Sequence, residues 1–255
     1  MFPRENRVFR RAGVTQLVEC DLAKVDVAGS NPVSRSKFLP SEKAMITRFL
    51  PLFLALSSVF CASAQNYKVE PISTAAPGVS GALASAVQAQ GYRISGPSGV
   101  WCEVWPAKSI PVAGKPSDGS VAFGIAQGTL LGVLRFPGKG ADRRDQVIPA
   151  GVYTMRYSNF PADGAHQGAA PQRDFALLTP IASDADPAAK PDFATLVQWS
   201  SKASGTSHPA VFSLEVPPSG AAAGTLTKEG EHDWTLTVKV GDLTFSVILV
   251  GKAEG

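Results

Sequence analysis

Apolar and polar residues alternate with a period of two in several segments between residues 67 and 250. Such alternation is typical of β-strands with one buried face, because successive side chains of a strand point to opposite sides. The pattern predicts strands over the following ranges: 67–72, 92–95, 100–105, 131–136, 151–158, 175–179, 210–216, 234–240 and 243–250. Gly241-Asp242 separates the last two of them, which predicts a tight hairpin.

Two segments are typical of helices instead. Residues 80–90 are rich in alanine and place Leu83 and Val87 on one helical face, and residues 192–201 follow Pro191. Strands dominate, and they follow one another closely along the chain. The sequence therefore predicts a mainly β domain, an antiparallel β-sandwich or a jelly-roll-like fold, with two peripheral helices.

Residues 45–64 are typical of a secretory signal peptide. A short basic start that includes Arg48 precedes an apolar run over 49–60, and Ala62-Ser63-Ala64 supplies a small-x-small cleavage pattern. We therefore expect an exported protein, periplasmic or extracellular, that begins at Gln65 and keeps no membrane span after cleavage.

Residues 13–36 resemble a translated transfer RNA gene. The codons that can encode residues 13–19 resemble its D-arm, those for residues 29–32 resemble its T-arm, and their separation fits a transfer RNA. The sequence thus predicts that residues 1–44 are disordered and arise from upstream translation. A basic N-terminal extension is the alternative. The single β-rich domain is expected over residues 65–255.

Charge and cysteine content change once residues 1–64 are set aside. Nine of the 24 basic residues and five of the 21 acidic residues lie there, so the remaining chain is slightly acidic. This balance argues against a nucleic-acid partner and against binding to an anionic membrane. Cys102 is the one cysteine after residue 64, and its apolar strand neighbours predict a buried free thiol.

A Pro-Ala-Gly turn over residues 149–151 leads into the alternating strand that contains Tyr153. Together with residues 163–175, this segment resembles an uncharacterised family of secreted bacterial β-sandwich domains. The resemblance implies a β-sandwich fold. It implies no activity, because the family has none assigned.

The connection over residues 159–173 is the first candidate site, because long loops in compact domains are often functional. It and the strand that follows carry four polar residues suited to ligand binding: Asp163, His166, Arg173 and Asp174. Asp163 and His166 can form an acid–base pair or, with His208 brought close by folding, a metal site. The alternative is an Asp-Gly turn with a surface histidine that packs on its own loop.

The second candidate site lies on the predicted strand 100–105. Strict alternation places Trp101, Glu103 and Trp105 on one face, where two indole rings flank a carboxylate. Such a face suits sugar stacking or peptide binding. The alternative is that this face packs against a helix or another sheet and leaves Glu103 at the rim.

Sequence motifs that would identify an enzyme are absent. The chain has no His-Glu-x-x-His, no Gly-x4-Gly-Lys-Ser/Thr and no Gly-x-Ser-x-Gly segment. The sequence therefore favours a binding or interaction module without a cofactor, whose partner is a small molecule, a glycan or a protein. The alternative function is a metal-dependent or acid–base hydrolase that uses the loop over residues 159–173.

Overall fold

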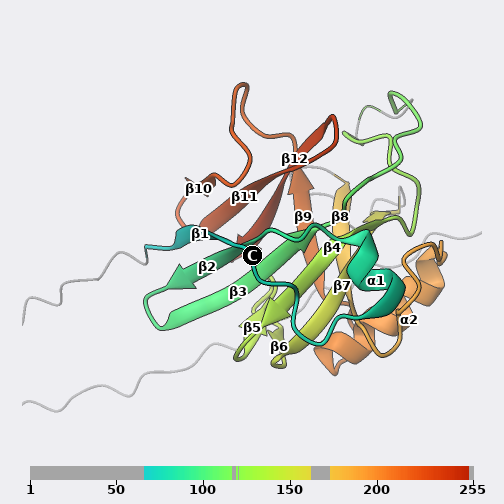
Figure 1. Ribbon diagram of the computed structural model, residues 1–255, viewed down its shortest axis with the longest axis horizontal. Helices are drawn as coiled ribbons and strands as arrows, with labels where there is room; N and C mark the ends of the chain where they lie inside the picture. Colours follow the sequence, from blue (N-terminus) through green and yellow to red (C-terminus); the bar gives the residue numbers. More distant parts are fainter. Residues whose placement is uncertain (1–65, 117–118, 120, 162–172, 253–255) are drawn as a thin grey trace, which may run out of the picture. The chain divides into compact units, whose positions relative to one another are not determined.

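The computed structural model describes residues 66–116, 119, 121–161 and 173–252. Within them, ten strands form one antiparallel sheet in the order β1-β2-β3-β4-β7-β8-β9-β12-β11-β10, nearly closed into a barrel (Figure 1). A two-stranded ribbon, β5 with β6, and two helices complete the described elements. The mainly β class and the two helices predicted from the sequence are therefore confirmed.

The helices and strands have the following bounds: β1 (Lys68–Ile72), α1 (Gly81–Ala86), β2 (Gly91–Gly96), β3 (Gly99–Pro106), β4 (Leu130–Phe136), β5 (Gly140–Ala141), β6 (Val147–Ile148), β7 (Gly151–Asn159), β8 (Asp174–Pro180), α2 (Phe193–Ser204), β9 (Val211–Glu215), β10 (Leu226–Glu229), β11 (Asp233–Val240) and β12 (Leu243–Val250). Nine of these strands coincide with predicted ranges to within two residues at each end. The predicted hairpin joins β11 to β12, where Val240 pairs with Leu243.

The inner face of the curved sheet carries the main hydrophobic core. Alternate residues of almost every long strand meet there, as the period of two predicts. Tyr153, Met155 and Tyr157 of β7 contribute to it, and so does Cys102 of β3. Cys102 is fully buried and is a free thiol, which confirms the prediction for this residue. Burial in this apolar core raises the pKa of its thiol far above the ordinary value.

The two helices lie outside the curved sheet and cover separate parts of its outer face (Figure 1). The segment containing α1 covers a cluster around Trp105 and Val133. Leu196 of α2 packs against Phe175 and Leu177 of β8. Residues that point outward from the sheet are therefore not all exposed to solvent.

Capping explains where α2 begins and ends. The Asp192 side chain accepts a hydrogen bond from the backbone N–H of Thr195 at 2.8 Å, and this bond lowers the pKa of its carboxyl. Gly205 ends the helix in the left-handed region with φ of 67°. By contrast, α1 is shorter than predicted, because Val87 leaves the helix to form a β-bridge with Ala107.

The two edge strands of the sheet, β1 and β10, approach one another at a seam. Tyr67, immediately before β1, places its ring centroid 5.6 Å from that of Trp234 in β11. Near the other end of β11, the Gln88 amide donates to the backbone carbonyl of Lys239 at 3.3 Å. Side-chain contacts of this kind connect the two margins of the sheet, whereas no backbone pairing of β1 with β10 is found among the described residues.

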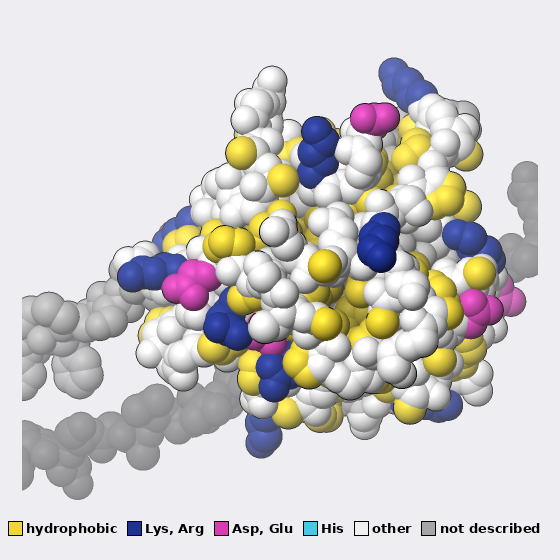
Figure 2. Space-filling model, viewed as in Figure 1, with side chains coloured by type: hydrophobic (Ala, Val, Ile, Leu, Met, Phe, Trp, Pro, Cys, Tyr) yellow, Lys and Arg dark blue, Asp and Glu magenta, His cyan; other side chains and the backbone are white. Residues whose placement is uncertain are grey.

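Charged side chains of both signs are interspersed on the face of the molecule in Figure 2. None of the helices in the described ranges has the length and apolar character needed to cross a bilayer. Residues 1–65 lie outside the described part of the chain, so the signal peptide and the upstream segment stay predictions.

Candidate functional site

The loop predicted as a site is only partly described. Residues 162–172, with Asp163 and His166, lie outside the described residues. At the loop base, the Phe160 N–H donates to the Arg173 carbonyl at 2.9 Å. The Arg173 guanidinium donates in turn to the Phe160 carbonyl, at 2.8 Å from Nε and 2.6 Å from Nη2. These bonds close the base of the loop and turn the Arg173 side chain back onto the chain itself.

Asp174 lies at the same loop base but is completely buried. Its carboxylate accepts hydrogen bonds from Tyr157 Oη at 2.5 Å and from the Ala122 N–H at 2.7 Å. Burial and the bond to Asp174 raise the pKa of the Tyr157 hydroxyl. The sequence suggested Asp174 for ligand binding, whereas the structure points its carboxylate at donors of the protein itself and ties the 122–123 segment to β7.

His208, the third member of the predicted metal set, lies in the exposed connection between α2 and β9. Its backbone carbonyl accepts from Ser204 Oγ at 2.6 Å. Within the described ranges, no group of three His, Cys, Asp or Glu residues is arranged to hold a metal ion. The metal set of Asp163, His166 and His208 stays a prediction, because two of its members are not described.

The second predicted site is divided by a β-bulge. Ile94 pairs with Cys102 but Ser95 pairs with Val100, so Trp101 is an extra residue in β3. Trp101 therefore packs with the main core, together with Cys102, instead of sharing a face with Trp105. The alternation expected across residues 100–105 fails at this position.

Glu103 and Trp105 remain on the outer face, and both are engaged by the protein. Glu103 accepts from Arg93 Nε at 2.9 Å and from Arg135 Nη1 at 2.7 Å. Burial alone would raise the pKa of Glu103, but the two arginines outweigh it and hold the pKa below its ordinary value. Trp105 is fully buried and donates from Nε1 to the Thr74 carbonyl at 2.8 Å. This matches the alternative of a packed outer face.

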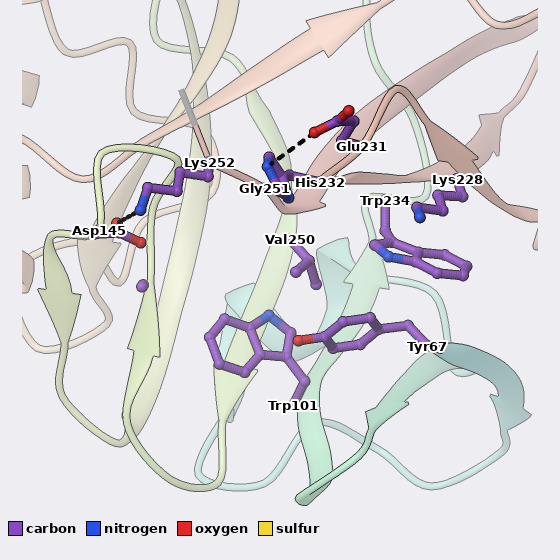
Figure 3. Close-up of a pocket in the computed structure, with 11 residues that line it drawn as sticks. Tyr67, Trp101, Asp145, Lys228, Glu231, His232, Trp234, Val250, Gly251 and Lys252 are labelled. Carbon is purple, nitrogen blue, oxygen red and sulfur yellow. Dashed lines mark ion pairs between the residues drawn. The ribbon is translucent and has the colours of Figure 1, made fainter. Parts of the chain in front are cut away.

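A different site forms at the seam and includes Trp101. A pocket of about 520 Å³ opens there, and we call it the seam pocket (Figure 3). Its lining residues are Tyr67, Trp101, Ala141, Asp145, Lys228, Glu231, His232, Trp234, Val250, Gly251 and Lys252. They come from the start of β1, from β3, from the β5–β6 connection and from the β10–β12 region, so only the folded sheet brings them together.

Three half-buried aromatic rings form one wall of the seam pocket. The Tyr67 ring lies between the other two, 6.4 Å from Trp101 and 5.6 Å from Trp234 (Figure 3). Trp101 Nε1 donates to the Leu249 carbonyl at 3.0 Å, which fixes this indole against β12. The wall is therefore anchored in the sheet and not carried on a loop.

Charged side chains surround the aromatic wall. His232 Nε2 lies 3.7 Å from a Glu231 oxygen, and Lys252 Nζ lies 3.4 Å from Asp145. Lys228 has no ion pair among the described residues. Trp234 Nε1 and Tyr67 Oη likewise have no hydrogen-bond partner within the described part of the chain. Neither atom is among the fully buried unpartnered ones there, so both reach open space.

The rim of the seam pocket is held by a second set of charges. Arg143 donates to both Asp233 oxygens, at 3.2 Å from Nε and 2.7 Å from Nη2. Asp142 is buried and accepts from the Arg144 and Gln146 backbone N–H groups, at 3.0 Å and 3.2 Å. The Asp142 and Arg143 side chains thus fix the β5–β6 connection beside the pocket.

Glu215 is the carboxyl with the largest upward pKa shift among the described residues. Burial raises its pKa first, and the neighbouring Glu229 and Asp233 add to the effect, to about 7, while Arg143 opposes them. Its place on β9, beside Ser246 of β12, puts it on the outer face of the sheet. No local sequence pattern signals that Glu215 and Glu229 meet, because they lie on different strands.

Comparison with known proteins gives no relative for this chain: no family model, no curated protein and no solved structure matches it. The resemblance to secreted β-sandwich domains stays a prediction. The geometry of the seam pocket is therefore the basis for proposing what the chain binds.

Proposed function

We propose that this protein is an exported, non-enzymatic binding module whose seam pocket holds the ring of a small molecule or of a glycan. One observation carries the proposal: Tyr67, Trp101 and Trp234 form a half-exposed aromatic wall beside polar groups that the described chain leaves unpaired. Ligand pockets combine apolar walls with a few convergent polar groups in this way.

The anchoring of the wall supports binding to a preformed surface. Trp101 is bonded to β12, and Tyr67 is packed between two indoles, so little side-chain freedom is lost when a ring stacks on them. Aromatic stacking adds about 0.5–1.5 kcal/mol to the apolar area that it buries. A ligand ring covered by this wall therefore gains affinity without ordering the site.

The curved sheet is the scaffold that carries the seam pocket. We propose that its two halves face one another across the main core, as in a β-sandwich or a jelly-roll-like domain. Export, to the periplasm or outside the cell, rests on the sequence of residues 45–64.

The four tryptophans of the chain offer a direct test. In a two-dimensional ¹H–¹⁵N spectrum of the full chain, each indole N–H gives one signal, assigned with Trp→Phe variants. A ring-bearing ligand in the seam pocket should shift the signals of Trp101 and Trp234. It should leave Trp105 and Trp199 unchanged, since they lie under the α1 segment and on α2.

The ligands for this titration are monosaccharides, disaccharides and simple aromatic compounds, each in a neutral and an acidic form. Selective shifts of Trp101 and Trp234 support the proposal. If every member of the panel leaves both signals unmoved at millimolar concentration, or shifts all four indoles alike, the seam pocket is not a ring-binding site.

A further inference from the structure

We infer that the seam pocket takes a ring that carries a carboxylate, so that its ligand is a cyclic or aromatic acid instead of a neutral ring compound. This inference rests on the proposed function and adds the charge of the ligand to it. The polar groups that the pocket leaves unpaired support it.

All three unpaired polar groups can donate a hydrogen bond. The indole N–H of Trp234 is a donor only, the Lys228 ammonium carries three donors and no acceptor, and the Tyr67 hydroxyl can donate. None has a partner among the described residues. In Figure 3, the Lys228 ammonium and the Trp234 nitrogen lie near one another, and the Tyr67 hydroxyl points to the Trp101 side of the pocket.

The acidic groups of the pocket form no ion pair with Lys228 within the described residues. The Glu231 carboxylate lies 3.7 Å from His232, and the Asp145 carboxylate lies 3.4 Å from Lys252. Lys228 is the cross-strand neighbour of Trp234, which places its charge next to the indole N–H. Within the described residues, the pocket therefore offers an ammonium group without an ion pair beside two neutral donors.

A carboxylate matches this set because it only accepts hydrogen bonds when it is ionised and has two oxygens to share among the donors. The ring attached to it would lie on the wall formed by Tyr67 and Trp101. A sugar hydroxyl or an amide also accepts, but it brings no charge to pair with Lys228. Charge pairing thus separates the inferred ligand from a neutral ring compound.

The test compares acids with neutral analogues of the same shape. Two sources share the inferred chemistry, so benzoate is paired with benzamide, and glucuronate with glucose. Calorimetric titration of the full chain at low ionic strength should show at least one acid binding about tenfold more tightly than its neutral partner, a gain in proportion to a charge-assisted hydrogen bond. Whichever pair shows the difference identifies the source of the ring.

Lys228→Gln should abolish most of this preference, because it keeps hydrogen bonding but removes the charge. Lys239→Gln is the matched control, since Lys239 is an exposed lysine on neighbouring β11 that does not line the pocket. Trp234→Phe should also weaken the binding of the acid more than the binding of the neutral analogue, because the variant keeps an aromatic ring and removes the N–H.

The outcomes separate this inference from the proposed function. Equal affinity for acid and neutral analogue, with shifts at Trp101 and Trp234, overturns the charge inference and leaves ring binding intact. A preference for acids that Lys228→Gln does not reduce also overturns it, because the charge then acts elsewhere. Failure of all four compounds to bind removes both proposals.

Discussion

Arg156 and the seam pocket represent two opposite ways of placing polar groups in this protein. The Arg156 side chain is fully buried on the outer face of β7, and each of its three nitrogens has a partner. Nε and Nη2 bind the Asp184 carboxylate, both at 2.7 Å, and Nη1 donates to backbone carbonyls. In the seam pocket, by contrast, donors of Tyr67 and Trp234 have no partner among the described residues.

The difference teaches how to separate structural from ligand-binding polar groups. A buried charge is tolerated only when its partners are complete, so Arg156 and Asp184 must hold the 184–190 segment against the sheet. A group that meets solvent can remain unpaired at little cost and stay available for a ligand. The comparison predicts large effects on stability at the first place and small ones at the second.

Asp184→Ala should be the most damaging change. It leaves the Arg156 guanidinium buried without its counter-ion and removes the acceptor of Thr154 Oγ1, so we expect a loss of about 3–5 kcal/mol in unfolding free energy. Urea denaturation measures it. Asp186→Asn is the control, since its exposed side chain accepts, within the described ranges, only from the Ala188 N–H, and it should cost less than about 1 kcal/mol. Equal losses of unfolding free energy in both variants would show that the buried ion pair matters no more than an exposed carboxylate.

Tyr157→Phe should have the next largest effect. The hydroxyl donates to the buried carboxylate of Asp174, and hydrogen bonds to charged groups contribute about 1.5–3 kcal/mol. Tyr153→Phe is the matched control, because its hydroxyl donates at 2.8 Å to the neutral carbonyl of Pro149. We expect the control to lose about 1 kcal/mol in the same denaturation experiment. A larger loss in the control would argue against Asp174 as a structural anion.

Titration of Glu215 should change the unfolding free energy by about 1 kcal/mol. This is less than its full pKa shift would give, because the side chain is half exposed to solvent. Its folded pKa of about 7 lies above the ordinary value of 4.5, so the folded state binds the proton more tightly. The contribution to stability is complete below pH 4.5 and is lost as the pH rises through 7. Glu229, Asp233 and Arg143 are the charged groups that act on it.

Thermal unfolding of wild type and Glu215→Gln, followed from pH 5 to pH 8, measures the contribution of Glu215 to stability. The wild type should lose stability relative to the variant as the pH rises. Glu70→Gln, an exposed residue of β1, should change nothing in this comparison. A constant difference between wild type and Glu215→Gln across the range would show that the carboxyl does not titrate there.

Tyr67→Phe and Lys228→Gln should have the smallest effects on stability, within about 0.5 kcal/mol, because neither polar group has a partner to lose among the described residues. Both should still weaken the binding of a ring-bearing acid. A stability loss above 1 kcal/mol in either variant would place that polar group with the structural ones and narrow the difference between the two regions.

Much of the fold is predictable from local pattern, because alternation and turn residues act over a few positions. Residues 234–250 illustrate this, since two alternating runs and a Gly-Asp turn yield β11 and β12. The pattern fails for β10, whose four residues are half-exposed or exposed and include Lys228 and Glu229. It also fails at Trp101, because one extra residue in β3 cannot be read from alternation alone.

The sites were harder to predict, since they depend on segments that meet only after folding. Arg156 alternates with the core residues of β7, but its burial follows from the distant segment 184–190. Trp101 was predicted as a binding residue on one face with Glu103 and Trp105, but the structure does not place it beside them. Its actual neighbours, Tyr67 and Trp234, come from the two margins of the sheet, and the sequence held no signal that those margins would meet.

Because the Cys102 thiol is fully buried, the rate at which a thiol reagent modifies it measures how often this part of the protein opens. Its neighbour Trp101 packs against Tyr67 at the seam and covers this part of the core. A reagent can therefore reach the sulfur only when this part of the sheet opens. The modification rate at Cys102 then reports how often the seam separates, and an occupied pocket should slow it.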